Sequence, residues 1–169
     1  MRLRLTKTEY IICENQGSLF NFIASRYTYD SFLSFVPAFL CSDFCRQEWD
    51  SSYSYFQFDD VKENLDFILP ELANKIYLNI ANDNDTVFDR NAAGWIGFTY
   101  RQIQILTAIS SRDLSRIIPF NSLCAAYPGL HTIDPVNAAA SIIEAYKLIQ
   151  PSRQLPVAEA AGSPGVRPH

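Results

Sequence analysis

The amino-acid sequence predicts an all-α protein, a compact bundle of six or seven helices with a disordered C-terminal tail. Apolar residues recur at helical spacing, capping residues precede most of these stretches, and strand signals are weak. The alternating run at 76–80 is the best strand candidate. We expect a helical domain at 1–150, because a chain of 169 residues that is 48% hydrophobic can bury an ordinary core. Four prolines and two glycines at 151–169 predict the tail.

The first helix is predicted from a capping box. Thr6 stands where an N-cap is needed, and Glu9 follows three residues later, so that each side chain can bond the other's backbone N–H. The helix is expected to run to about Asn15 and to stop at Gly17, because glycine is the commonest residue just past a helix end. A separate helical stretch is expected at 19–23.

Two further helices in the first half contain proline. Asp30 is expected to cap a helix over 31–50, with a kink or break just before Pro37. The acidic pair at 59–60 opens the next helix, in which Pro70 marks a kink or boundary. In the second half, capping residues and prolines predict four helices. The first follows the Asp89 cap and ends at about 107, and the others cover 113–118, 119–127 and 135–149.

Charge and composition exclude several classes of function. The formal net charge is −4, with no basic run, so nucleic acid is not the expected partner. No stretch of eighteen apolar residues occurs, so we expect no membrane span. Lys7 and Glu9 interrupt any apolar core of a secretory signal, which favours a cytoplasmic protein.

The four cysteines are expected to be reduced structural thiols, mostly buried, because no secretory signal is present. They are Cys13, Cys41, Cys45 and Cys124. The i, i+4 spacing of the middle pair can supply two zinc ligands on one helix face, but no second pair completes a site. We expect neither a metal nor another cofactor.

Three groups of residues are candidate binding residues. Asp59, Glu63 and Asp66 share one helix face and form either a solvated surface or a patch that docks a basic partner. Arg101, on a strongly apolar helix, needs an acidic partner or a place in a pocket beside Tyr100.

His131 is the third candidate, and it is the only histidine before the tail. It is either a general base in the turn at 127–134 or a structural residue that bonds a carbonyl or Asp134. No nucleophile or metal-ligand motif accompanies it, so we assign no catalytic residue and favour the structural role.

A helix-turn-helix at 110–127 is a further alternative. Arg112 and Arg116 lie on its first helix, whereas its second helix carries no Lys or Arg. A recognition helix without basic residues is a poor reader of DNA, so a packed corner is favoured.

Two segments, Gly94–Arg101 and Tyr127–Thr132, with Ser110–Leu114 between them, resemble small uncharacterised bacterial proteins of toxin–antitoxin-type loci. The resemblance covers about 90–150 and implies a type of locus without catalytic residues. The sequence therefore predicts a non-catalytic protein-binding module, antitoxin-like or regulatory, that acts through a helical surface. A small enzyme using His131 and a DNA-binding protein are the alternatives, and neither the protein partner nor the oligomeric state is specified.

Overall fold

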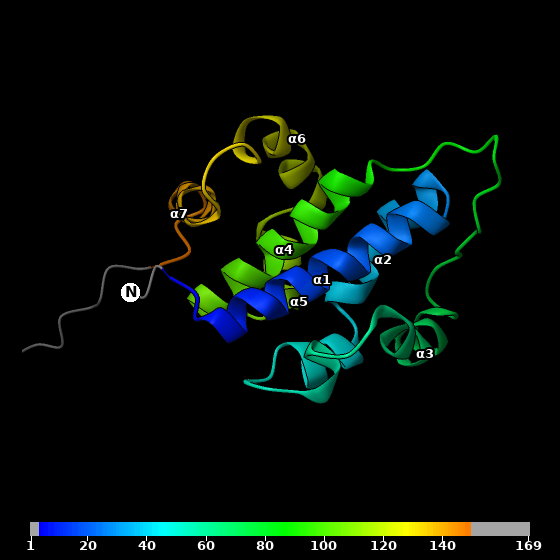
Figure 1. Ribbon diagram of the computed structural model, residues 1–169, viewed down its shortest axis with the longest axis horizontal. Coiled ribbons are helices and arrows are strands. Elements are labelled where there is room, and N and C mark those ends of the chain that lie inside the picture. The colour runs from blue at the N-terminus through cyan, green and yellow to red at the C-terminus, as the bar shows by residue number, and fades with distance from the viewer. Residues whose placement is uncertain (1–3, 150–169) are drawn as a thin grey trace, which may run out of the picture.

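The computed structural model describes residues 4–149, and within this range the protein is all-α, as the sequence predicts (Figure 1). The tail expected at 151–169 lies outside the described residues. No helix of the described part is long and apolar enough to cross a membrane. The elements are α1 (Lys7–Arg26), α2 (Tyr29–Leu40), the π-helical turn η1 (Cys45–Trp49), the 3-10 turn η2 (Tyr55–Gln57), α3 (Val61–Leu72), α4 (Arg90–Thr107), α5 (Ser111–Ile117), α6 (Phe120–Leu130) and α7 (Pro135–Ala145).

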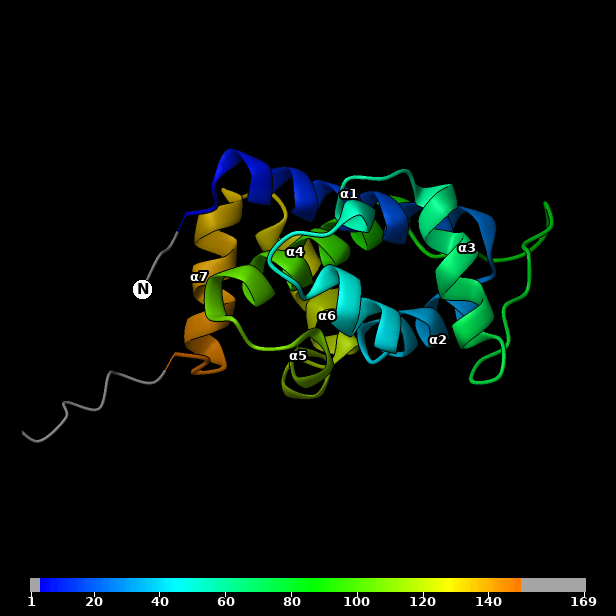
Figure 2. The same ribbon diagram turned by 90° about the horizontal axis from the view of Figure 1, so that it is seen from below.

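Helices α1 and α4 form the centre of the bundle and lie side by side in both views (Figures 1 and 2). α1 also contacts α2, α3 and η2, whereas α4 contacts α5, α6 and α7. In Figure 1, α6 and α7 therefore lie on one side of the central pair, and α3 lies on the other side. Segments from both halves of the chain thus depend on the same pair of helices.

Glycine allows these two helices to approach closely. A Cβ atom added to Gly17 would lie 2.8 Å from the carbonyl oxygen of Gly94, and one added to Gly97 would lie 2.8 Å from that of Gln16.

The capping box of Thr6 and Glu9, predicted at the start of α1, is confirmed. The expected stop at Gly17 is wrong, since α1 continues through it to Arg26 and includes the stretch at 19–23. The missing side chain serves the helix crossing and does not end the helix.

Proline does not end the helices at the positions where the sequence predicted a kink or an end. α2 begins after Thr28, not Asp30, and continues through Pro37 to Leu40. Pro70 lies inside α3, and Pro128 lies inside α6, so α6 extends beyond its expected end near 127. Packing of the apolar faces of these helices compensates for the N–H group that each proline lacks.

Three other expected elements also differ. The helix predicted over 31–50 is divided into α2 and η1, and α7 ends at Ala145 instead of 149. The strand predicted at 76–80 does not form within the described residues, where Ile80 makes only an isolated antiparallel bridge with Tyr27. A single bridge offers no sheet for the alternating apolar residues to join.

Phenylalanines pack the core on the inner side of α1. Phe20 is wholly buried and meets the rings of Phe32, Phe35 and Phe39 edge-on, with centroids 5.8–6.3 Å apart. Such T-shaped contacts stabilise aromatic pairs beyond the burial of their area. These rings hold α2 against α1 and lead towards Trp49, whose ring lies 6.3 Å from that of Phe39.

Gly97→Ala is expected to destabilise the protein by about 1–3 kcal/mol, because the new methyl group would collide with the backbone of α1 and with the ring of Phe20. Gly129→Ala is the matched control. It lies in α6 with nothing within 4 Å of the added carbon, so it should be neutral or stabilise by about 0.5–1 kcal/mol. Urea unfolding measures both, and equal free energies of unfolding for the two variants would contradict the close crossing.

Candidate functional site

Arg101 of α4 is wholly buried, and every nitrogen of its guanidinium group is hydrogen-bonded. Nη1 lies 2.9 Å from Oδ1 of Asp50, which forms the predicted ion pair. Nε and Nη2 both donate to Oε1 of Gln16, at 2.9 and 2.7 Å. The remaining acceptors are the carbonyl oxygen of Trp49, Oε1 of Gln104, Oγ of Ser111 and Sγ of Cys45.

Asp50 joins this network to α5. Its Oδ2 accepts the backbone N–H of Ser111 at 2.9 Å, and its Oδ1 accepts the hydroxyl of the same residue. Removal of one partner from a buried ion pair typically costs about 3–5 kcal/mol, because the other charge is left without compensation. The network therefore fixes the loop after η1 against α4.

Tyr100 and Arg101, both candidates from the sequence, do not reach the surface. The exposed fraction of Tyr100 is 1%, and its hydroxyl donates to the carbonyl oxygen of Ile118 at 2.7 Å. Burial raises the pKa of Tyr100 above its ordinary value, so it stays a neutral donor. Both residues are buried, and their polar groups bond other residues of the protein.

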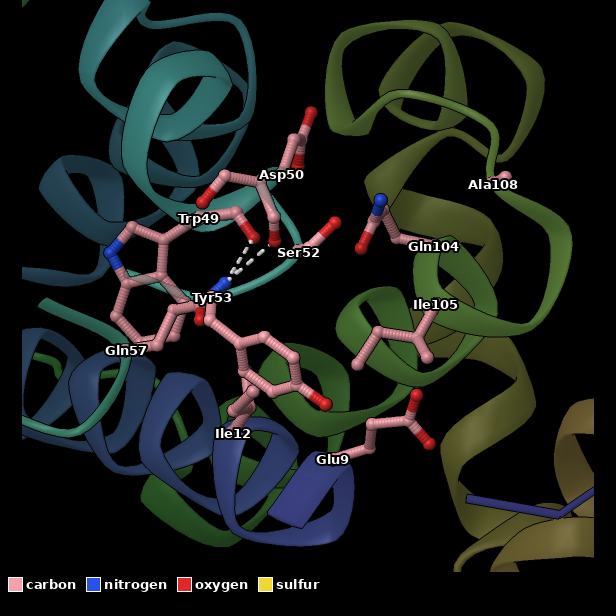
Figure 3. Close-up of a pocket in the computed structure, with 11 residues that line it drawn as sticks. Glu9, Ile12, Trp49, Asp50, Ser52, Tyr53, Gln57, Gln104, Ile105 and Ala108 are labelled. Carbon is pink, nitrogen blue, oxygen red and sulfur yellow. Dashed lines mark hydrogen bonds between the residues drawn. The ribbon is translucent and has the colours of Figure 1, made fainter. Parts of the chain in front are cut away.

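A recess of about 380 Å³ lies beside this network, between α1, the loop after η1 and the end of α4 (Figure 3). Gln57 holds the loop in place by donating to the carbonyl oxygens of Trp49 and Ser51, both at 3.0 Å. Tyr53, whose exposed fraction is 67%, stands on the same loop. We call this cavity the Trp49 recess. Its lining includes Glu9, Ile12, Trp49, Asp50, Tyr53 and Gln104.

The Trp49 recess has an acidic lining. Carboxylates reach it from Glu9 on α1 and Asp50 after η1, and among residues 4–149 no Lys or Arg lines it. Gln104 uses its Oε1 to accept from Arg101, so its amide nitrogen is the group left to donate. The surface of the recess thus carries anionic and polar groups, and two of these, Asp50 and Gln104, also bond the buried Arg101.

A second surface feature adjoins the same loop, and we call it the acidic–aromatic patch. Three of its side chains are largely exposed aromatic rings, with exposed fractions of 46–68%. Between them in the sequence stand the three acidic residues predicted above, on or just before α3. The patch consists of Tyr55, Phe58, Asp59, Glu63, Asp66 and Phe67.

The hydroxyl of Tyr55 ties the patch together by donating to Oε2 of Glu63 at 3.3 Å. The neighbouring carboxyl group of Asp59 raises the pKa of Glu63, and hydrogen bonding with Glu63 lowers the pKa of Asp59. Of the two carboxyl groups, Glu63 is therefore the one that protonates first as the pH falls. The only basic residue between 55 and 67 is Lys62, so the segment has an excess of negative charge.

His131 lies elsewhere, at the end of α6. Its Nδ1 is 2.6 Å from the carbonyl oxygen of Tyr127, and the two rings stack with centroids 4.3 Å apart. His131 lines a separate, smaller cavity of about 250 Å³, whose other walls include Tyr10, Trp95 and Phe98. The ring thus bonds a carbonyl group, one of the two partners expected for it, and its structural role stays a prediction.

All four cysteines are free, and they form no metal site. Cys41 and Cys45 do not share a helix face, because α2 ends at Leu40 and η1 begins at Cys45. Burial raises the pKa of Cys13 and of Cys45 to about 12, so both thiols stay protonated near neutral pH. Within residues 4–149 no group of three or more His, Cys, Asp or Glu is arranged to hold a metal ion.

Helices α5 and α6 form the corner considered as a helix-turn-helix. Arg112 donates to the carbonyl oxygen of Cys41 at 2.7 Å, so it joins α5 to the end of α2. Arg116 is largely exposed and lies 4.0 Å from Asp113. α6 carries no basic residue that could read a base edge. The geometry is that of a packed corner.

Comparison of the chain with protein-family models, curated proteins and solved structures finds no match. Sequence reasoning identified the acidic residues of the patch but not the Trp49 recess, whose walls lie far apart in the sequence. The aromatic-rich loop at 51–58 was the available signal, since exposed tyrosines on a loop often mark contact surfaces.

Arg101→Gln is expected to destabilise the protein by about 3–5 kcal/mol, because Asp50 would lose its charged partner in a mostly buried position. Arg116→Gln, on the exposed face of α5, is the control and should change the free energy of unfolding by less than about 0.5 kcal/mol. Chemical denaturation compares the two variants. A loss below about 1 kcal/mol for Arg101→Gln would show that the network does not support the fold.

His131→Ala should destabilise the fold by about 1 kcal/mol, through loss of the bond to the Tyr127 carbonyl and of the ring stack. Thermal melting measures this change. A variant that melts like the wild type and yet loses a cellular activity outright would instead identify His131 as a functional residue.

Proposed function

We propose that the protein is a non-catalytic protein-binding module that docks a basic partner on its acidic–aromatic patch. The observation that carries this proposal is that Tyr55, Phe58 and Phe67 are all substantially exposed on the same short segment as three carboxylates, and that Tyr55 bonds one of these, Glu63. Exposed aromatic rings are the residues that most often dominate binding energy at protein interfaces. Carboxylates around them favour a partner of opposite charge.

The supporting framework is stiff, which suits recognition. Phe67 stacks on Phe44 with centroids 6.0 Å apart, and its ring meets that of Phe56 edge-on at 4.8 Å. Phe44 is buried, so the exposed ring of Phe67 packs directly against a residue of the core. A pre-ordered aromatic side chain loses less conformational entropy on binding than a free one.

The two alternatives have less support. Among the described residues, His131 bonds the Tyr127 carbonyl and stacks on that ring, and no carboxylate lines the cavity beside it. The corner at 110–127 has no basic recognition helix. The resemblance over 90–150 adds the proposal of an antitoxin-like or regulatory role in the bacterial cytoplasm, with a toxin as the basic partner.

The test replaces three carboxylates by neutral isosteres in one variant, Asp59→Asn with Glu63→Gln and Asp66→Asn. Asp60, which caps α3, is left unchanged so that the helix still forms. The partner is identified by mass spectrometry of protein co-purified from the native host, and its affinity is then measured with purified components. We expect a loss of at least about tenfold, carried mainly by slower association and largest at low salt.

A variant with Glu14→Gln, Asp83→Asn and Glu144→Gln is the control, because it removes the same charge from exposed positions outside the patch. Its affinity should stay within about twofold of the wild type. Equal loss of affinity in the two variants would mean that overall charge, and not the patch, attracts the partner. Unchanged affinity in the patch variant would contradict the proposal.

A further inference from the structure

We propose that a cavity between α1, α4 and α7 binds a neutral, flat nitrogen heterocycle of the aminopurine type, as the free base or the nucleoside. It is the cavity of about 250 Å³ that His131 lines, and we call it the Trp95 cavity. α7 and α3 lie on opposite sides of the central helix pair (Figure 1), so this cavity is remote from the acidic–aromatic patch. The inference therefore goes beyond the proposed function and does not depend on it.

Gln102 is the residue that points to a ligand. It lines the Trp95 cavity from α4 and is only 2% exposed. No residue of the described part of the chain bonds the oxygen or the nitrogen of its side-chain amide. Within residues 4–149 the only sealed side-chain polar atom without a partner is Oδ2 of Asp59, so the amide of Gln102 keeps access to the cavity. Burial of an amide without partners costs free energy, which a ligand that bonds both of its ends would recover.

Thr99, one turn before Gln102 on α4, adds a second polar group to the lining. It is 2% exposed, and within residues 4–149 its hydroxyl has no hydrogen bond. A threonine inside a helix commonly donates to the carbonyl oxygen four residues earlier, as Thr107 does to Ile103 at 2.7 Å. Thr99 does not use this local acceptor. Its hydroxyl is therefore a donor and an acceptor for a molecule in the cavity.

His131 supplies a further acceptor. Its Nδ1 lies 2.6 Å from the carbonyl oxygen of Tyr127, and a carbonyl oxygen can only accept. Nδ1 therefore carries the proton of the neutral ring, and Nε2 has a free lone pair. Three polar groups thus belong to one small lining, and each of them is neutral when the imidazole ring is neutral.

The rest of the lining is aromatic and apolar. It includes the rings of Tyr10, Trp95 and Phe98, and the first and last of these meet edge-on with centroids 5.3 Å apart. Aromatic side chains bind flat heterocycles by stacking. Among residues 4–149 no Asp, Glu, Lys or Arg lines the cavity, so a charged ligand would lose hydration without gaining a partner. A volume of about 250 Å³ is below the roughly 300 Å³ at which sites for drug-sized ligands begin, so it suits one or two fused rings.

The amide of Gln102 selects the edge of the heterocycle. It holds a donor and an acceptor side by side, so it pairs with a ligand edge on which an acceptor and a donor are adjacent. Adenine has this arrangement in its ring nitrogen N7 and its exocyclic amino group, and glutamine is one of the side chains that bond both. A phosphate group would find no basic side chain among the described residues of the lining. The expected ligand is therefore the base or the nucleoside, without phosphate.

The first experiment titrates the full chain with 9-methyladenine and follows the side-chain amide signal of Gln102 and the indole N–H signal of Trp95 by NMR. We expect both signals to shift saturably, with a dissociation constant on the order of millimolar. The indole N–H of Trp49 is buried, donates to Asn64 at 3.0 Å and lies outside this lining, so its signal should not move. 9-Methylpurine, which lacks only the amino group, should bind at least about fivefold more weakly.

Gln102→Met removes both ends of the amide and keeps the length of the side chain. Because the native amide has no partner among the described residues, the variant should melt at the same temperature as the wild type or higher. Its affinity for 9-methyladenine, followed on Trp95, should fall by at least about fivefold. Gln47→Met makes the same change at an exposed position outside the lining, and it should leave the affinity unchanged.

Several outcomes would overturn the inference. Absence of saturable shifts, equal shifts of both tryptophans, equal binding of 9-methylpurine or unchanged affinity in Gln102→Met would contradict the site. A lower melting temperature of Gln102→Met would mean that the amide is bonded within the protein. Tighter binding of adenosine monophosphate or of an adenine oligonucleotide than of adenosine would overturn the choice of a ligand without phosphate. The triple variant of the acidic–aromatic patch should bind 9-methyladenine normally, so failure of one proposal leaves the other intact.

Discussion

The close crossing of α1 and α4 is the constraint on which the rest of the structure depends. Because Gly17 and Gly97 have no side chain, Gln16 can donate its amide to the carbonyl oxygen of Gly97 at 3.0 Å. Its other side-chain atom, Oε1, then faces Arg101 one turn further along α4. The crossing thus places the acceptor that orients the guanidinium group, and that group in turn holds Asp50. The walls of the Trp49 recess follow from this series of contacts.

Much of the fold could be predicted from local signals. Caps at Thr6, Asp60, Asp89 and Asp134 begin helices where the sequence indicates, because a side-chain oxygen bonding the first free N–H groups is a local interaction. Helix ends were less predictable. Gly17 fits a local rule for ending a helix, but its tertiary contact with α4 prevails over that rule.

The candidate site likewise has one part that could be predicted from the sequence and another that could not. Asp59 and Glu63 are four residues apart, so their proximity could be predicted from the period of a helix, and the pKa of Glu63 reflects it. The partner of Arg101 could be predicted as acidic but not as Asp50, since the two residues meet only through the packing of η1 against α4 and α5. Likewise, Glu9 on α1 and Gln104 on α4 both line the recess. They are far apart in the sequence, so no local pattern could predict that they share a cavity.

The Arg101 network also has a consequence for the dynamics of the fold. Its acceptors come from α1, η1 and α5 as well as from α4 itself, so opening any one of these segments would leave a buried charge partly unpaired. The lost pairing alone costs about 3–5 kcal/mol, so we expect these four segments to open together. Backbone amides around Arg101 should therefore exchange with solvent only through global unfolding. The walls that surround the recess keep one geometry, and a ligand that enters need not first order them.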